Sequence, residues 1–177
     1  MERDLTMKEA CISFWKNGLN FRGRARRAEY WLPLLAFTMI IFLGMALAIV
    51  IDILTGFKLN ITENVFIPAL DILYWILFIP FLSLAVRRLQ DININGIYAI
   101  IVSVAFIPVL LMSYFYTEKE LYNFDTTFGK VYTILYVSLI VIDLILLILA
   151  MKEGTRGTNK YGDDRKYIED NEEYIKR

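Results

Sequence analysis

Four long apolar segments constrain the fold of this 177-residue chain more than any other feature. The first runs for 22 residues between Glu29 and Asp52 without a charged side chain, and only the second and fourth contain an aspartate. A helix of about 20 apolar residues crosses the hydrocarbon core of a bilayer, which is about 30 Å thick. Four such segments joined by short charged connections cannot all be buried inside a small water-soluble domain. We therefore expect an all-α membrane protein, a bundle of four transmembrane helices at about residues 31–52, 65–86, 92–117 and 131–151.

The composition agrees with this fold class. Hydrophobic residues make up 57% of the chain, aromatic residues 15%, and the mean hydropathy is +0.48. Soluble domains contain about 45–50% apolar residues. A membrane β-barrel is disfavoured because its strands alternate in polarity over about ten residues, whereas these segments are continuously apolar.

Several classes of function are excluded by composition. The chain contains no histidine, which excludes histidine acid–base chemistry, histidine-ligated metals and Ser-His-Asp triads. The single cysteine, Cys11, excludes an internal disulfide and a CxxC pair. Nineteen basic and nineteen acidic residues give no net charge, which argues against a nucleic-acid partner. We expect no cofactor, no metal and no catalytic residue.

Lysine and arginine are unequally divided between the two sides of the expected spans. The N-terminal arm (residues 1–30), the connection between the second and third spans, and the tail (residues 152–177) together contain sixteen, and the other side contains three. Cytoplasmic segments of membrane proteins carry this excess of positive charge. We therefore expect both termini to lie in the cytoplasm.

The N-terminal arm contains a short amphipathic pattern. Met7, Cys11, Phe14, Trp15 and Gly18 fall on one face of a helix, with polar residues on the other faces. The pattern predicts a short helix, which either lies in the cytoplasmic interface of the membrane or packs over the mouth of the bundle.

Two carboxylates are expected inside the membrane, where an ionised group is costly and marks a candidate functional site. Asp71 lies near the outer end of the second span, and Asp143 lies deeper, in the fourth span, on the same helix face as Tyr136. Asp143 is either a hydrogen-bonding clamp between helices or a site for a proton or cation.

Three motifs fall on the expected cytoplasmic side: FRGRARRAEYW at residues 21–31, RRLQD followed by NG at residues 87–96, and GTRGTNKYGDD at residues 154–164. Their order and spacing resemble those of the domain of unknown function 805 family of small bacterial inner-membrane proteins. This chain has Gln90 where the family motif usually has histidine. The resemblance implies the fold and a bacterial inner-membrane location, but no biochemical activity.

We expect the three motifs to form one cluster of charged and polar side chains beneath the helices. Its members are Arg24, Arg27, Glu29, Arg87, Arg88, Asp91, Asn159 and Tyr161. Such a network would lock the helix ends together and hold an anionic lipid headgroup, since guanidinium groups bind phosphates.

The favoured function is a non-enzymatic scaffold, partner-binding or lipid-binding module. Its partners would be anionic membrane lipids, a second copy of the chain or another membrane protein. The alternatives are a small transporter or channel component that uses Asp143 and Asp71, and an enzyme that acts on lipid phosphates through the arginines.

Overall fold

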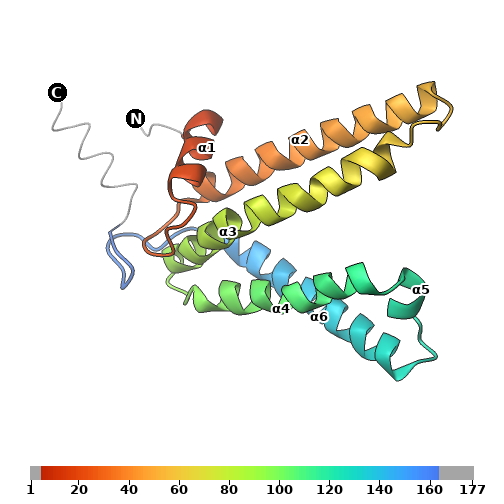
Figure 1. Ribbon diagram of the computed structural model, residues 1–177. Helices are drawn as coiled ribbons and strands as arrows, with labels where there is room; N and C mark the ends of the chain where they lie inside the picture. Colours follow the sequence, from red (N-terminus) through yellow and green to blue (C-terminus); the bar gives the residue numbers. More distant parts are fainter. Residues whose placement is uncertain (1–4, 164–177) are drawn as a thin grey trace.

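The computed structural model describes residues 5–163, so the part of the tail beyond Asp163 lies outside the described residues. Every regular element in the described range is a helix. These elements are α1 (Met7–Lys16), α2 (Arg27–Leu54), the π-helical turn η1 (Thr62–Phe66), α3 (Ile67–Asp91), α4 (Ile97–Phe115), α5 (Glu118–Leu121) and α6 (Thr127–Met151) (Figure 1). Four helices are long and apolar enough to cross a membrane: α2, η1 continued by α3, α4 and α6. The predicted all-α class with four spans is confirmed.

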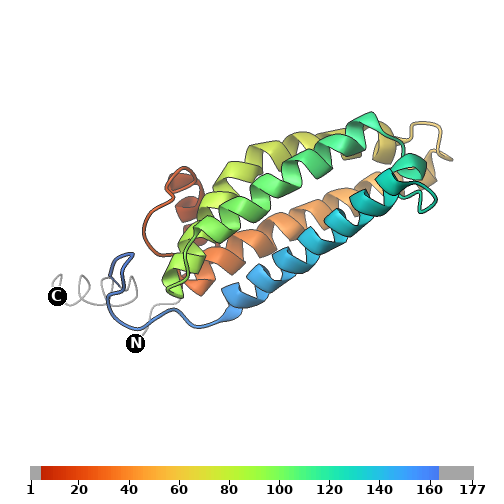
Figure 2. The same cartoon turned by 90° about the horizontal axis from the view of Figure 1, so that it is seen from below.

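The four long helices form two pairs that meet at one end of the molecule. In Figure 1, α2 runs beside α3 and α4 runs beside α6, and the two pairs diverge with distance from α1. In the view from below, α3 and α4 overlap in projection, as do α2 and α6 (Figure 2). The end where the pairs meet also carries α1, the arm loop (residues 17–26), the connection from α3 to α4 and the tail loop (residues 152–163). The three sequence motifs therefore lie together at this end.

The third span begins later than expected. Residues 92–96 form a turn between α3 and α4 rather than the first turn of a helix. Asn93 adopts a left-handed conformation with φ of 61°, and the Ile94 N–H donates to the carbonyl of Leu89 at 2.9 Å. A Cβ on Gly96 would lie 2.5 Å from Cγ1 of Val86, so the turn packs directly on α3.

The short helix α1 packs against α2 and α3 near the end where the helix pairs meet. A capping box between Thr6 and Glu9 fixes its first turn. Phe14 is buried, with its ring centroid 5.4 Å from that of Phe37 on α2 and 4.8 Å from that of Phe81 on α3. Trp15, expected on the same apolar face, is 52% exposed.

Side-chain caps fix the connections at the opposite end. Asp52 accepts hydrogen bonds from the backbone N–H of Ile61 at 2.5 Å and of Thr62 at 2.9 Å, so the end of α2 holds the beginning of the next span. In α5, the backbone N–H of Thr117 donates to the Glu120 carboxylate at 2.9 Å and the Thr117 hydroxyl donates at 2.8 Å. These hydrogen bonds lower the pKa of Glu120.

Candidate functional site

Asp91, in the last turn of α3, joins two buried arginines. Its Oδ1 accepts from Nε of Arg24 at 2.8 Å, and its Oδ2 accepts from Nη1 of Arg88. Arg88 and Asp91 are three positions apart and share a face of α3, whereas Arg24 comes from the arm loop. The exposed fractions are 3% for Arg24, 0% for Arg88 and 6% for Asp91. We call these three residues the Arg–Asp clamp.

Arg88 connects α3 to the end of α6. Its Nε donates to the carbonyl of Ala150 at 2.9 Å, and its Nη2 donates to the carbonyl of Lys152. Its Nη1 also donates to the carbonyl of Ala25 in the arm loop at 3.2 Å. The last carbonyls of a helix lack partners within the helix and carry partial negative charge. The end of α6 therefore helps the single carboxylate of Asp91 to balance two buried positive charges.

Arg24 connects the clamp to the tail loop. Its Nη1 donates to the carbonyls of Gly157 at 2.6 Å and Gly162 at 3.4 Å, and its Nη2 donates to the carbonyl of Thr155. Arg24 and Arg88 thus make four hydrogen bonds each, all with acceptors in this chain. An arginine carries five N–H groups, so the hydrogen-bonding capacity of both side chains is nearly used within the protein.

The tail loop is also fastened directly to the end of α3. The backbone N–H and the hydroxyl of Thr155 both donate to the carbonyl of Asp91 at 2.9 Å. Nδ2 of Asn159 donates to the carbonyl of Gln90 at 3.0 Å and to Oγ1 of Thr155 at 2.8 Å. Oδ1 of Asn159 accepts from the backbone N–H of Tyr161 at 2.8 Å, which closes the loop.

The tail loop has a glycine at position 154, where the chain passes directly against Asp91. A Cβ at this position would lie 2.2 Å from Oδ2 of Asp91, which is far inside van der Waals contact. Only a glycine lets the chain leave α6 and pass directly against the clamp.

Five members of the predicted cluster lie outside the clamp. Asn159 and Tyr161 belong to the tail loop, and the other three are Arg27, Arg87 and Glu29. Arg27 pairs with Glu153 at 3.0 Å, and both side chains are exposed, by 51% and 71%. Arg87 is buried, and its Nη2 donates to the carbonyl of Asn17 at 3.4 Å. Glu29 is buried and accepts from Oγ of Ser13 at 3.1 Å.

Glu29 and Arg87 help to hold α1 and the arm loop against the bundle, whereas Arg27 forms an exposed ion pair with the tail loop. Glu29 also accepts from the backbone N–H of Arg26 at 3.0 Å, in the first turn of α2. The backbone N–H of Ala25 donates to the carbonyl of Arg87 at 3.1 Å. The predicted cluster is therefore divided into a buried clamp, an arm contact and an exposed ion pair.

The polar residues expected inside the membrane do not form one group. Tyr136 stacks on Tyr132, with ring centroids 6.2 Å apart, and packs near Tyr122. Asp71 is exposed on α3, whereas Asp143 lines a cavity near the clamp. Among residues 5–163, no group of three or more histidine, cysteine, aspartate or glutamate side chains could hold a metal ion.

Gln90 and Thr155 belong to the site but were not among the residues predicted from the sequence. Nε2 of Gln90 donates to the carbonyl of Phe21 at 3.2 Å, which joins the arm loop to α3. The only signal for Gln90 was its position in the middle motif, where relatives usually carry histidine. Most hydrogen bonds of Thr155 involve backbone atoms of Thr155 or of its partner. Because every residue has a backbone, such bonds cannot be recognised from the spacing of residue types in a sequence.

Comparison with known proteins agrees with the motifs that build the clamp. The sequence profile of DUF805, described as a protein of unknown function, matches residues 18–163. This chain belongs to the DUF805 family. The matched region runs from the arm loop to the last described residue of the tail loop, so it includes all three motifs and all four spans.

Two relatives of the DUF805 chain come from Escherichia coli strain K12. The inner membrane protein YhaI is 32% identical over 157 residues, which cover 88% of this chain and 94% of YhaI. The inner membrane protein YhaH is 33% identical over 102 residues, which cover 56% of this chain and 77% of YhaH. No solved structure matches this DUF805 chain significantly. The chain is a small inner-membrane protein of a family whose function is unknown.

Proposed function

We propose that this protein is a non-catalytic membrane scaffold that binds anionic lipid headgroups through exposed basic residues around a rigid cytoplasmic end. The observation that carries the proposal is the contrast between two groups of basic side chains at this end. Arg24 and Arg88 are buried and donate to acceptors of this chain, so they stabilise the fold. The basic rim is exposed at the same end and consists of Lys16, Arg22, Arg27, Lys152, Arg156 and Lys160.

The buried group supports the scaffold part of the proposal. The clamp joins the arm loop, α3, the end of α6 and the tail loop, so these segments form one rigid unit. A lipid phosphate could reach Arg24 or Arg88 only by displacing carbonyls of the tail loop. This arrangement disfavours an enzyme that would use these arginines to hold a reacting phosphate.

The exposed group supports the lipid-binding part. Both termini lie in the cytoplasm in this proposal, as the division of lysine and arginine favours. The rim would then lie at the headgroup level of the cytoplasmic leaflet, where each lysine or arginine contributes about 1 kcal/mol of attraction to anionic lipid. Among residues 5–163, the interaction that Arg27 would lose on binding a phosphate is an exposed ion pair with Glu153, and such pairs contribute about 0–1 kcal/mol.

Native mass spectrometry of the full chain, purified after exchange into phosphatidylglycerol-containing nanodiscs, tests the proposal. We expect the wild type to retain phosphatidylglycerol and a double variant, Arg22→Gln with Arg27→Gln, to retain much less at an unchanged Tm. The matched control is Lys119→Gln with Lys130→Gln, which removes two exposed charges at the opposite end.

Two results would contradict the proposal. One is a wild type that carries no more anionic than zwitterionic lipid. The other is loss of lipid in a correctly folded Arg88→Ala variant while the rim variant keeps it, because the buried arginine would then be the ligand-binding residue.

A further inference from the structure

Asp143 stands apart from the other carboxylates in the membrane-spanning helices. The carboxylate of Asp52 caps the next span, and Asp71 is exposed on α3 near the end of the molecule away from the clamp. Asp143 instead lines a cavity of about 60 Å³ between the two helix pairs, and the residue is exposed. Within residues 5–163 its carboxyl group makes no hydrogen bond. An intramembrane carboxylate of this kind requires a partner that the described chain does not supply.

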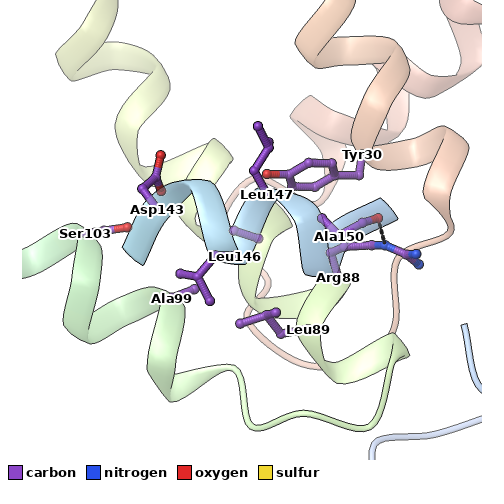
Figure 3. A pocket seen from close by; sticks show the side chains of 10 residues that line it. Tyr30, Arg88, Leu89, Ala99, Ser103, Asp143, Leu146, Leu147 and Ala150 are labelled. Atoms are coloured by element: carbon purple, nitrogen blue, oxygen red, sulfur yellow. Dashed lines mark hydrogen bonds between the residues drawn. The ribbon is translucent and has the colours of Figure 1, made fainter. Parts of the chain in front are cut away.

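Three helices contribute polar side chains to the lining of this cavity (Figure 3). Asp143 comes from α6, Ser103 from α4 and Tyr30 from α2. Figure 3 shows the Tyr30 hydroxyl directed toward α6, with Ser103 near Asp143. The volume of about 60 Å³ is the space open to the centres of water-sized spheres. One water molecule needs about 10–15 Å³ of such space, so the cavity holds a few water molecules. Oxygen atoms of the two hydroxyls and the carboxylate, completed by water, are suitable ligands for a small cation.

The charges around the cavity leave Asp143 unbalanced when it is ionised. On α3, Arg88 lines the cavity, but its guanidinium is paired with Asp91 and bonded to carbonyls on the side of the clamp. On α2, the polar group that lines the cavity is the Tyr30 phenol, which is uncharged near neutral pH. On α4, the polar group that lines the cavity is the Ser103 hydroxyl. An ionised Asp143 would therefore carry one uncompensated negative charge in a low-dielectric environment.

We propose that Asp143, Ser103 and Tyr30 form a binding site for one small monovalent cation, either a proton or Na⁺. One positive charge neutralises the single carboxylate. A divalent ion would leave an excess positive charge in the membrane, where charge is costly. The cavity is too small for a large organic cation. The site shares no residue with the basic rim, so its test is independent of lipid binding.

The test uses the full chain in nanodiscs of phosphatidylcholine. Thermal unfolding is followed in NaCl and in choline chloride at equal ionic strength. If Na⁺ binds, the wild-type Tm rises by about 2–4 °C in NaCl, because a ligand bound only by the folded state stabilises it. Infrared spectroscopy follows the C=O band of the protonated Asp143 carboxyl against pH. If protons bind, the band disappears as pH rises.

Competition between the proton and Na⁺ shows which of the two cations occupies the site. Na⁺ binds only the deprotonated carboxylate, so it lowers the midpoint pH of the infrared titration if both cations use Asp143. A titration without an effect of NaCl assigns the site to the proton alone. A rise in Tm without a titrating band assigns it to Na⁺ alone.

Three variants make the result specific. Asp143→Asn abolishes the response to both cations, and Asp71→Asn, which alters the other span aspartate, leaves the response unchanged. If Asp143→Asn does not fold, Ser103→Ala provides the test, since losing one neutral ligand reduces the Na⁺ response or moves the infrared midpoint. A wild type that responds to neither Na⁺ nor pH, or that responds as Asp143→Asn does, overturns the proposal.

Discussion

At the scale of single residues, Asp91 joins three segments through both its carboxylate and its backbone carbonyl. Its carboxylate accepts from two arginines, and its carbonyl accepts from both the N–H and the hydroxyl of Thr155. The sequence predicted that Arg24, Arg88 and Asp91 lie together, because their motifs fall on one side of the spans. It could not predict that most of the arginine N–H groups bind carbonyls, since every residue has a carbonyl and its direction depends on the fold.

The first prediction concerns Gly154, which contacts the same carboxylate. Gly154→Ala adds a Cβ that would lie 2.2 Å from Oδ2 of Asp91, so the tail loop or the clamp must shift. We expect the free energy of unfolding to fall by about 1–3 kcal/mol, as for other overpacked buried sites. Chemical unfolding in detergent measures this change, and limited proteolysis measures release of the tail.

The neighbouring Glu153 provides the control, because its side chain is 71% exposed and forms only a surface ion pair. Glu153→Ala should alter the free energy of unfolding by at most about 1 kcal/mol. Equal stability of Gly154→Ala and the wild type would show that the tail loop does not pack on Asp91.

At the scale of elements, the length and polarity of a segment predicted which segments are helices, but they predicted the first and last residues of these helices less well. The four spans were expected from apolar length, and the helical face of α1 identified Phe14 as a packing residue. The start of α4 was placed too early, at about residue 92, because residues 92–96 carry no charge, although Asn95 and Gly96 already indicated a turn. The sequence did not indicate that Asp52 acts as a cap. Its partners, the N–H groups of Ile61 and Thr62, come close only because the chain folds back after α2.

The second prediction tests this cap. Asp52→Ala removes the acceptors of the Ile61 and Thr62 N–H groups and should cost about 1–2 kcal/mol, as losses of helix caps do. Hydrogen–deuterium exchange should accelerate at these two amides before it changes elsewhere. Lys58→Ala, an exposed change in the same connection, serves as the control. Unchanged protection in Asp52→Ala would exclude the cap.

At the scale of the whole molecule, the sequence predicted the number of spans but not how the helices pair. The spans are apolar on all faces, so no stripe of residues indicates which helix packs on which. The divergence of the α2–α3 pair from the α4–α6 pair is therefore a feature of the structure alone (Figure 1). The clamp at their common end supplies a physical reason why the pairs stay together there.

The third prediction concerns orientation. In a Cys11→Ser background, a cysteine at exposed Lys16 should react with a membrane-impermeant maleimide only after the membrane is opened. A cysteine at exposed Asp125, before α6, should react in intact cells or right-side-out vesicles. The reverse pattern of labelling would place the clamp and the basic rim outside the cytoplasm, and would remove the basis for binding to the cytoplasmic leaflet.

The central claim is that the Arg–Asp clamp locks the ends of the helices together, and a double-mutant cycle on Arg88 and Asp91 tests it most directly. The free energy of unfolding of the full chain in detergent is measured for Arg88→Ala, Asp91→Ala and the double variant. Each single change should cost about 3–5 kcal/mol. Asp91→Ala leaves two buried arginines without a carboxylate, and Arg88→Ala leaves Asp91 with Arg24 alone and removes the donor to the carbonyls of Ala25, Ala150 and Lys152. The double variant should cost less than the sum of the two. The claim would be contradicted if Arg88→Ala and Asp91→Ala lowered the free energy of unfolding as little as Arg27→Ala, which removes an exposed ion pair. It would also be contradicted if the loss in the double variant equalled the sum of the two single losses.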